Sequence, residues 1–350
     1  MNLSTILLFI IEKMSGQRSM NASLHIIRGK KSGQTLQDVD YFNSKPYFGI
    51  WPKIRQDLFN DAIEELFQEG FICVQDEFIH VTEKGRQAIS AVAPYQFKGW
   101  DYRGKEMVFF GRVALVVQTV SHLRDGIRTF VPMRSETEIQ MFVKKLILQQ
   151  SLSRQQLGAS LREELILAIN NCGMTDRQKY LFSYRLAGSG MSAKTWEQLA
   201  LTMESCVDEV YLLFIESLHK LLPLVEKNKE DYPLLHQCTA DVKVHTYLTD
   251  SAYRTKKMFD NGYSMKDIAT MRQLKQSTIE DHFVEMAMND SKFPIRHFVV
   301  EEAIEAVQKK SEALRTKRLK VLKDEFEELS YFQLRLILAV QKRGLKNEFA

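Results

Sequence analysis

The chain has 350 residues, a formal net charge of +4 and 45% hydrophobic residues, a composition that excludes a protein disordered throughout. Its 16 glycines and 7 prolines are too few for a collagen-like or proline-rich protein and favour a mainly helical one. At roughly 100–200 residues per domain, two or three domains are expected. The small net charge leaves only local basic clusters as an electrostatic argument for a polyanionic partner.

The most apolar stretch of the chain runs from Ile6 to Ile11 and turns polar at Glu12. A membrane-spanning helix needs about 20 apolar residues, and a secretory signal needs a basic start and a small-residue cleavage site. We therefore expect a buried first helix, no membrane contact and a cytoplasmic protein. The four cysteines lack zinc-ribbon or thioredoxin spacing, so no metal ion or other cofactor is expected.

Residues 1–95 form the first predicted domain, in which helical patterns precede two short strands. A long amphipathic helix carries apolar residues at helical spacing and is followed by Gly70, a common signal for the end of a helix. Helices followed by a β-hairpin are the element order of a winged helix. The expected helices are 3–13, 19–28 and one that carries Leu58, Ala62 and Leu66, and the expected strands are 71–74 and 78–81.

Residues 96–235 form the second predicted domain, whose helices are short and closely spaced. Ser135 and Glu138 have the spacing of a capping box, in which each side chain satisfies a free amide at a helix start. Residues 176–218 carry a Leu-Ala, turn, Val arrangement that resembles the fourth region of bacterial sigma factors, a helix-turn-helix unit. Helices are expected at 112–122, from the capping box to about 150, and at 161–171, 176–187, 195–202 and 206–221.

Residues 246–350 form the third predicted domain, which contains a sharper helix-turn-helix pattern at 253–289 and C-terminal helices. Ser264 is the expected cap of the second helix, with Asp267 at its third position. Two steeply crossing helices need a small residue at their contact, an apolar residue in the turn and apolar residues on the inner face. These positions are Ile268, Ala269, Leu274, Ile279 and Phe283. A plain helical hairpin is the alternative.

The third helix of each unit is acidic where a DNA-reading helix is usually basic or amide-rich. Residues 276–289 contain Glu280, Asp281 and Glu285 and no lysine or arginine, and residues 206–215 contain two acids and no base. Phosphates repel such side chains. Both units are therefore expected to contact protein, or to touch DNA only through flanking residues.

Positive charge concentrates in two segments of the sequence. Residues 18–55 contain seven lysines and arginines against two aspartates, with Tyr47, Phe48 and Trp51 interleaved for base stacking, whereas residues 56–89 are acidic. Residues 309–323 contain seven further lysines and arginines and one glutamate. The alternatives are that the aromatic residues belong to the core and that the charges are solvated, with pairing to nearby acids. The candidate DNA contacts are Arg18, Arg28, Lys30, Lys31, Lys53, Arg55, Lys317, Arg318 and Lys320.

No pattern in the sequence predicts catalysis. The run Gly29-Lys30-Lys31-Ser32 is only superficially like a phosphate loop, because Leu24 stands where such a loop has glycine and Lys31 stands where it has serine or threonine. The histidines show no metalloprotease spacing and the chain has no nucleophile elbow. We therefore expect a binding protein without enzymatic activity.

Two stretches of the chain resemble domains of helicases. The winged-helix (RQC) domain of RecQ-family helicases is resembled by the residues Leu24 to Gly29, Phe48-Gly49, Leu66, Gly70 to Ile72, Val81-Thr82 and Gly85. Residues 251–289 are similar to the helix-turn-helix domain at the C-terminus of some of these enzymes. A chain that carries both domains without a helicase motor domain resembles the YpbB family of Firmicutes.

This resemblance implies a non-catalytic accessory subunit of a RecQ-family helicase, associated with the nucleoid and active in DNA repair or recombination. In RecQ enzymes the winged helix contacts duplex DNA near the fork, and the N-terminal basic residues would carry that role here. The acidic second half of the winged domain departs from the family pattern. The alternative function is a helix-turn-helix transcription regulator that binds an operator.

Overall fold

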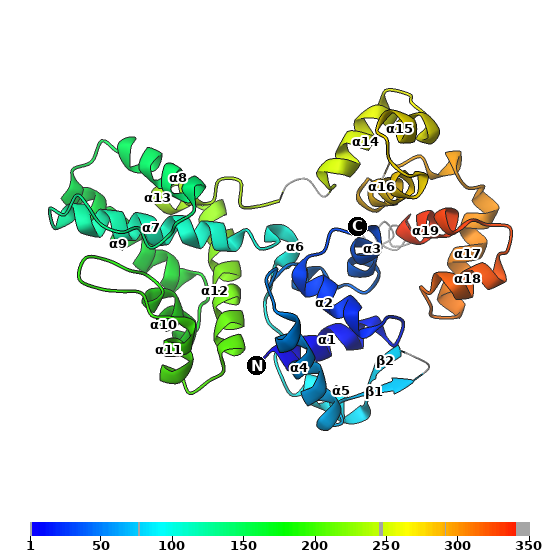
Figure 1. The fold of residues 1–350 in the computed structure, drawn as a ribbon, viewed down its shortest axis with the longest axis horizontal. Helices are drawn as coiled ribbons and strands as arrows, with labels where there is room; N and C mark the ends of the chain where they lie inside the picture. Colours follow the sequence, from blue (N-terminus) through cyan, green and yellow to red (C-terminus); the bar gives the residue numbers. More distant parts are fainter. Residues whose placement is uncertain (1, 76–77, 245–247, 291, 341–350) are drawn as a thin grey trace.

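The computed structural model describes residues 2–75, 78–244, 248–290 and 292–340. These residues form a mainly helical molecule with one small two-stranded antiparallel sheet, which confirms the predicted fold class (Figure 1). The N-terminal helices lie between a group of middle helices and a group of C-terminal helices in this view. Within the described ranges, no helix is both long enough and apolar enough to cross a bilayer.

The N-terminal part is built on a buried first helix, as predicted. Ile6, Leu7 and Ile10 of α1 have no exposed surface, and α1 packs on α4 and on the hairpin. The strands pair with Ile72 opposite Val81. Two helices in this part, α3 and α5, have no counterpart in the sequence prediction. The elements are α1 (Leu3–Met14), α2 (Met20–Arg28), α3 (Gly33–Tyr41), a 3-10 turn (Lys45–Tyr47), α4 (Gln56–Gln68), β1 (Ile72–Gln75), β2 (Phe78–Val81) and α5 (Glu83–Ser90).

The middle helices surround α12, which is 21 residues long and buried along most of its length. The predicted capping box before α8 is wrong. Glu136 occupies the N-cap position in place of Ser135, and its side chain makes no capping hydrogen bond. Capping boxes form instead before α9, α10 and α11. The elements are α6 (Gly99–Tyr102), α7 (Glu106–Arg124), α8 (Thr137–Leu148), α9 (Arg154–Asn171), α10 (Asp176–Tyr184), α11 (Trp196–Thr202), α12 (Val207–Lys227) and α13 (Pro233–Cys238).

The C-terminal helices form a compact group in which α16 packs against both α14 and α19. This group does not pack alone, because α16 also packs against α3 of the N-terminal part. The helices are α14 (Asp250–Asp260), α15 (Met265–Met271), α16 (Gln276–Asn289), α17 (Glu301–Ala313), α18 (Leu319–Glu325) and α19 (Tyr331–Val340), with a 3-10 turn at Ile295–His297.

The two ends of the chain share one hydrophobic core. Val307, Leu322 and Leu334 belong to the same buried cluster as the apolar residues of α1, α2 and α4. The boundaries predicted at 95 and 246 therefore separate segments that pack on each other. The aromatic segment between the first two predicted domains is also packed: Tyr95, Phe97, Trp100 and Tyr102 are all buried.

Candidate nucleic-acid interface

The helix-turn-helix predicted near residue 264 is present with the expected inner packing. Ile268, Ile279 and Phe283 are fully buried, and Ala269 and Leu274 pack against the same cluster. The side chains then occupy the contact, turn and inner-face positions that two crossing helices require. These contacts confirm the motif.

The cap of the second helix is also confirmed. The Ser264 hydroxyl accepts a hydrogen bond from the Asp267 backbone amide at 3.2 Å. The Asp267 carboxylate in turn accepts one from the Ser264 amide at 3.3 Å. This reciprocal pair satisfies two amides that the first turn of α15 would leave free.

The third helix of this unit, α16, is enclosed by the rest of the molecule. His282, Val284, Glu285, Met286 and Ala287 are buried in addition to the inner-face residues. Helices α3, α14 and α19 cover it, and the figure shows α3 and α19 close to α16 (Figure 1). A recognition helix must present an open face to the major groove. In this fold the exposed residues of α16 are Gln276 and Ser277 in its first turn and Asn289 at its end.

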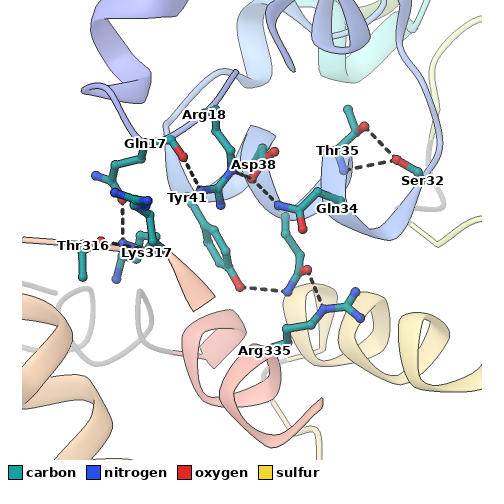
Figure 2. Close-up of polar contacts among 12 residues, drawn as sticks. Gln17, Arg18, Ser32, Gln34, Thr35, Asp38, Tyr41, Thr316, Lys317 and Arg335 are labelled. Atoms are coloured by element: carbon teal, nitrogen blue, oxygen red, sulfur yellow. Dashed lines mark hydrogen bonds and ion pairs between the residues drawn. The ribbon is translucent and has the colours of Figure 1, made fainter. Parts of the chain in front are cut away.

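The acidic residues of α16 take part in internal contacts. The Asp281 carboxylate forms an ion pair with Arg335 of α19 at 2.5 Å. The Arg335 Nε donates to Gln37 Oε1 at 2.9 Å, and the Gln37 amide donates to the Tyr41 hydroxyl at 2.8 Å (Figure 2). These bonds tie α19 and α16 to α3. The sequence indicated acidic side chains that would repel phosphate, and the structure shows that Asp281 instead holds the covering helix in place.

Glu285 caps the start of α14 from a buried position. Its carboxylate accepts hydrogen bonds from the Thr249 backbone amide and, at 3.0 Å, from the Thr249 hydroxyl. Burial raises the pKa of Glu285, and the Thr249 hydrogen bonds and the nearby charges of Arg103 and Lys31 partly oppose that rise. The Glu285 side chain is therefore not available to contact a base, and Asp281, although 42% exposed, is paired with Arg335.

The second unit has the predicted inner residues. Its third helix, α12, is buried along most of its length. Leu199, Ala200 and Val210 are buried. In the first turn of α12, the Asp208 carboxylate accepts a hydrogen bond from the Leu3 backbone amide at 2.8 Å, and Glu209 accepts one from the Ser205 hydroxyl at 2.7 Å. The third helix therefore starts against α1, although Val207 in its first turn is 40% exposed.

Four of the predicted DNA contacts lie together around the end of α2. The Arg28 guanidinium donates to the Ile54 carbonyl oxygen at 2.9 Å and so links α2 to the loop before α4. Lys30, Lys53 and Arg55 are exposed around this link. Arg55 pairs with Asp57 at 2.8 Å, but both side chains are well exposed, so the pair contributes little. We call these four residues, Arg28, Lys30, Lys53 and Arg55, the basic edge.

The two remaining N-terminal candidates differ, since Arg18 faces the protein and Lys31 is exposed. The Arg18 Nε donates to Asp38 at 2.7 Å, with the two side chains 14% and 4% exposed (Figure 2). Arg18 also lies over the Phe42 ring. The guanidinium therefore stabilises the packing of α3, and a DNA contact for Arg18 stays a prediction. Lys31 is exposed but lies near Glu285 of α16.

The C-terminal basic residues lie against the N-terminal part. The Gln17 side-chain oxygen accepts a hydrogen bond from the Lys317 backbone amide at 2.6 Å, and its amide nitrogen donates to the Arg315 carbonyl at 3.4 Å (Figure 2). The Arg318 guanidinium lies 4.2 Å from the centre of the Phe78 ring of β2. Sequence analysis did not predict that these basic residues lie beside the N-terminal part. We call Arg315, Lys317, Arg318 and Lys320 the wing-side cluster.

The basic segment 309–323 is not one continuous helix, since α17 ends at Ala313 and α18 begins at Leu319. Part of it follows the alternative that the sequence left open. Lys310 pairs with Glu325 at 2.8 Å, and the Lys323 ammonium donates to backbone carbonyls of the following loop. Of the candidates in this segment, Lys320 is exposed and Lys317 and Arg318 are half-buried.

The aromatic residues proposed for base stacking belong mostly to the core, which corrects that interpretation. Tyr47 is 4% exposed and Phe48 is fully buried. Trp51 is half-buried and stacks on Tyr211 of α12, with ring centres 4.4 Å apart. Of the three, only Trp51 has exposed surface that a ligand could contact. Within the described ranges, no three His, Cys, Asp or Glu side chains are grouped to hold a metal ion.

These features define a mainly helical protein with a helix-turn-helix domain, and residues 251–338 match the family model of a helix-turn-helix domain. The chain is also similar to Protein YpbB of Bacillus subtilis (strain 168), with 29% identity over 337 residues that cover 94% of each chain. The similarity extends over nearly the whole length of both proteins and supports the predicted resemblance. No solved structure matches the chain significantly.

Proposed function

We propose that the protein is a non-catalytic subunit that holds DNA through phosphate contacts and docks a RecQ-family helicase, in the cytoplasm beside the nucleoid. The observation that carries the proposal is the placement of the two basic groups. The basic edge lies at the C-terminal end of α2, and the wing-side cluster contacts the loop before its N-terminal end and the hairpin.

The length of α2, near whose two ends the groups lie, is comparable with the width of a DNA groove. A helix of nine residues such as α2 is about 13 Å long at 1.5 Å per residue. This length is close to the width of the major groove of B-DNA, about 12 Å. Phosphate contacts of this kind position a protein on DNA without reading its sequence, which agrees with the enclosed α16.

The exposed face of α4 favours a protein partner. Asp57, Asp61, Glu64 and Glu69 are exposed along or just after this helix. In a winged helix, the helix before the hairpin is the one that usually approaches DNA, and phosphates would repel this acidic face. We therefore assign α4 to docking a basic surface of the helicase and the two basic groups to DNA.

Fluorescence anisotropy with a labelled DNA fork, measured over a series of salt concentrations, tests the DNA contact. The triple variant Lys30→Glu, Lys53→Glu and Arg55→Glu should weaken binding at least about tenfold. Each lost phosphate contact should reduce the slope of log affinity against log salt by about one unit. Lys144→Glu, a charge reversal on an exposed site of α8, is the matched control. Equal affinity and slope for the triple variant and the control would overturn the assignment.

Affinity purification with the RecQ-family helicase of the same organism tests the second half of the proposal. The full-length chain should retain the helicase, and the variant Asp61→Lys with Glu64→Lys should lose it while its circular-dichroism spectrum stays unchanged. Absence of retention by the unmodified chain would contradict the helicase partner but leave the DNA assignment standing.

The alternative of a transcription regulator is disfavoured by the enclosure of α16. An operator-binding protein should discriminate its site from random duplex by roughly a thousandfold or more. The arrangement proposed here predicts little sequence preference, which competition with random duplex in the same anisotropy assay measures.

A further inference from the structure

A groove lies where the N-terminal part meets the middle helices, and of its lining residues the sequence had singled out only Trp51 and Lys53 as candidate nucleic-acid contacts. Its volume is about 670 Å³, within the range of about 300–1,000 Å³ usual for sites that hold a small molecule or part of a polymer. Its walls come from the loop before α4, the start of α7, the start of α8, and α12. We call it the Trp51 groove.

Two glycines allow the walls to approach each other. Gly104 has φ +87°, and a Cβ atom there would lie 2.6 Å from the Pro52 ring. Gly49 has φ +73°, and a Cβ atom there would lie 3.1 Å from the Arg103 Cα. Both positions favour glycine, since other residues are strained at these φ values. This close contact brings Lys53 of the basic edge and Lys105 to the same groove.

The groove is positively charged above an apolar floor. Five basic side chains and two carboxylates line it, and the two carboxylates are those of Glu136 and Glu138. Lys53 and Lys105 are exposed. Lys105 donates to a backbone carbonyl, that of Asp241, at 3.0 Å, so this hydrogen bond does not neutralise its charge.

Two arginines of the groove have part of their guanidinium without a hydrogen-bond partner among the described residues, although Arg134 also forms an ion pair with Glu136 at 3.0 Å. The Arg112 guanidinium lies over the Phe142 ring and donates to two backbone carbonyls. Burial lowers the pKa of Arg112. The Nε–H groups of Arg112 and Arg134 are buried and have no hydrogen-bond acceptor in the described part of the chain. An anion in the groove would stabilise both side chains electrostatically.

The floor offers aromatic and aliphatic surface. Trp51 and Tyr211 are stacked with an interplanar angle of 27°, and Met107 lies in the same wall. A ligand that combines a planar apolar group with a phosphate matches these two features. A duplex is too wide to enter a concave site of this volume, whereas one or two nucleotides of a single strand fit it.

We propose that the Trp51 groove binds a short segment of single-stranded nucleic acid, with phosphates at Lys53 and Lys105 and a base against the Trp51–Tyr211 pair. This inference rests on the proposed DNA-binding function and names the strand that the groove selects. The groove shares Lys53 with the basic edge, so a strand displaced at a fork could pass from one to the other.

The test uses the full-length chain and a fluorescent twelve-residue oligothymidylate, with a duplex of the same length for comparison. Lys105→Glu should weaken binding of the single strand roughly tenfold and change duplex binding less than about twofold, because Lys105 lies outside the basic edge. Lys144→Glu should change neither affinity. The oligonucleotide should also quench intrinsic tryptophan fluorescence, and Trp51→Phe should remove most of that quenching.

The outcomes separate this inference from the broader proposal. If duplex binding depends on the basic edge while Lys105→Glu leaves single-strand binding unchanged, the groove assignment fails and the proposed function stands. If Lys105→Glu weakens binding of an acidic peptide with an aromatic residue but not of the oligonucleotide, the groove belongs to a protein ligand and the inference is overturned. If the chain binds no DNA at all, both proposals fail.

Discussion

The third helix of the helix-turn-helix domain and the basic edge beside α2 differ in what surrounds their charged side chains. In α16, Asp281 pairs with Arg335 and Glu285 caps the start of α14. At the basic edge, Lys30, Lys53 and Arg55 face solvent. A helix-turn-helix motif thus contributes its third helix to packing in this protein, and we propose that DNA contacts fall to residues outside the motif.

The largest effect is expected from the core of the helix-turn-helix domain. Phe283 of α16 is fully buried and contacts the rings of Phe259 in α14 and of Phe293 and Phe298 after α16. Phe283→Ala should lower the free energy of unfolding by about 3–5 kcal/mol, because it removes apolar contacts and leaves a cavity. Urea unfolding measures this change. Leu201→Ala, at a position 83% exposed, is the control and should stay within about 0.5 kcal/mol of the unmodified chain.

A pH-dependent effect is expected from His282 of α16. Burial, followed by the charge of Arg272, lowers the pKa of His282 from 6.5 to about 4 in the folded state, where its Nδ1 lies 2.8 Å from the Thr255 hydroxyl. Above pH 6.5 both folded and unfolded states hold the neutral ring. As the pH falls from 6.5 to 4, the unfolded state binds the proton first, so stability falls by at most about 3 kcal/mol.

Urea unfolding at several pH values between 7 and 4.5 checks this expectation. His282→Asn should flatten the part of the pH dependence that lies in this interval. His25 and His236 also have lowered pKa values, so the difference between the unmodified chain and the variant is the relevant measure. The same pH profile for both proteins would show that α16 does not hold a neutral buried histidine.

A smaller effect is expected where α3 covers α16. Arg335→Met removes the ion pair with Asp281 and the hydrogen bond to Gln37, and should cost about 1–2 kcal/mol, since Asp281 is 42% exposed and can be solvated. Our proposal assigns DNA binding to residues outside α16, so affinity for DNA should not change. An increase in affinity for DNA in the same variant would mean that α16 can contact DNA once α19 is released. That result would contradict the assignment of α16 to packing.

The smallest effect is expected from two serines that both have capping-box spacing in the sequence. Ser264 caps α15 through its hydroxyl, and Ser264→Ala should lower the free energy of unfolding by about 1 kcal/mol. Ser135 has capping-box spacing but does not cap α8, so Ser135→Ala should have almost no effect. Thermal unfolding of the two variants measures the difference, and equal losses would contradict the assigned caps.

The sequence by itself determined the elements whose signals are local. Apolar residues at helical spacing predicted α1, α4 and the helix-turn-helix residues from Ile268 to Phe283, and the hairpin followed from two short apolar runs. Each of these signals depends only on residues that are close together in the sequence, so it can be recognised without knowledge of the fold. Helix α3 was missed because its buried Gln37 and Asp38 look polar, and their partners, Arg335 and Arg18, lie in other elements.

Only the tertiary structure decided which surfaces remain free. The bond between Gln17 and Lys317 joins residues 300 positions apart, and the one between Arg335 and Gln37 joins residues 298 apart. No local pattern encodes such contacts, because they depend on how the shared core brings the two ends of the chain together. That packing encloses α16, places the wing-side cluster beside the hairpin and leaves Lys30, Lys53 and Arg55 exposed to solvent.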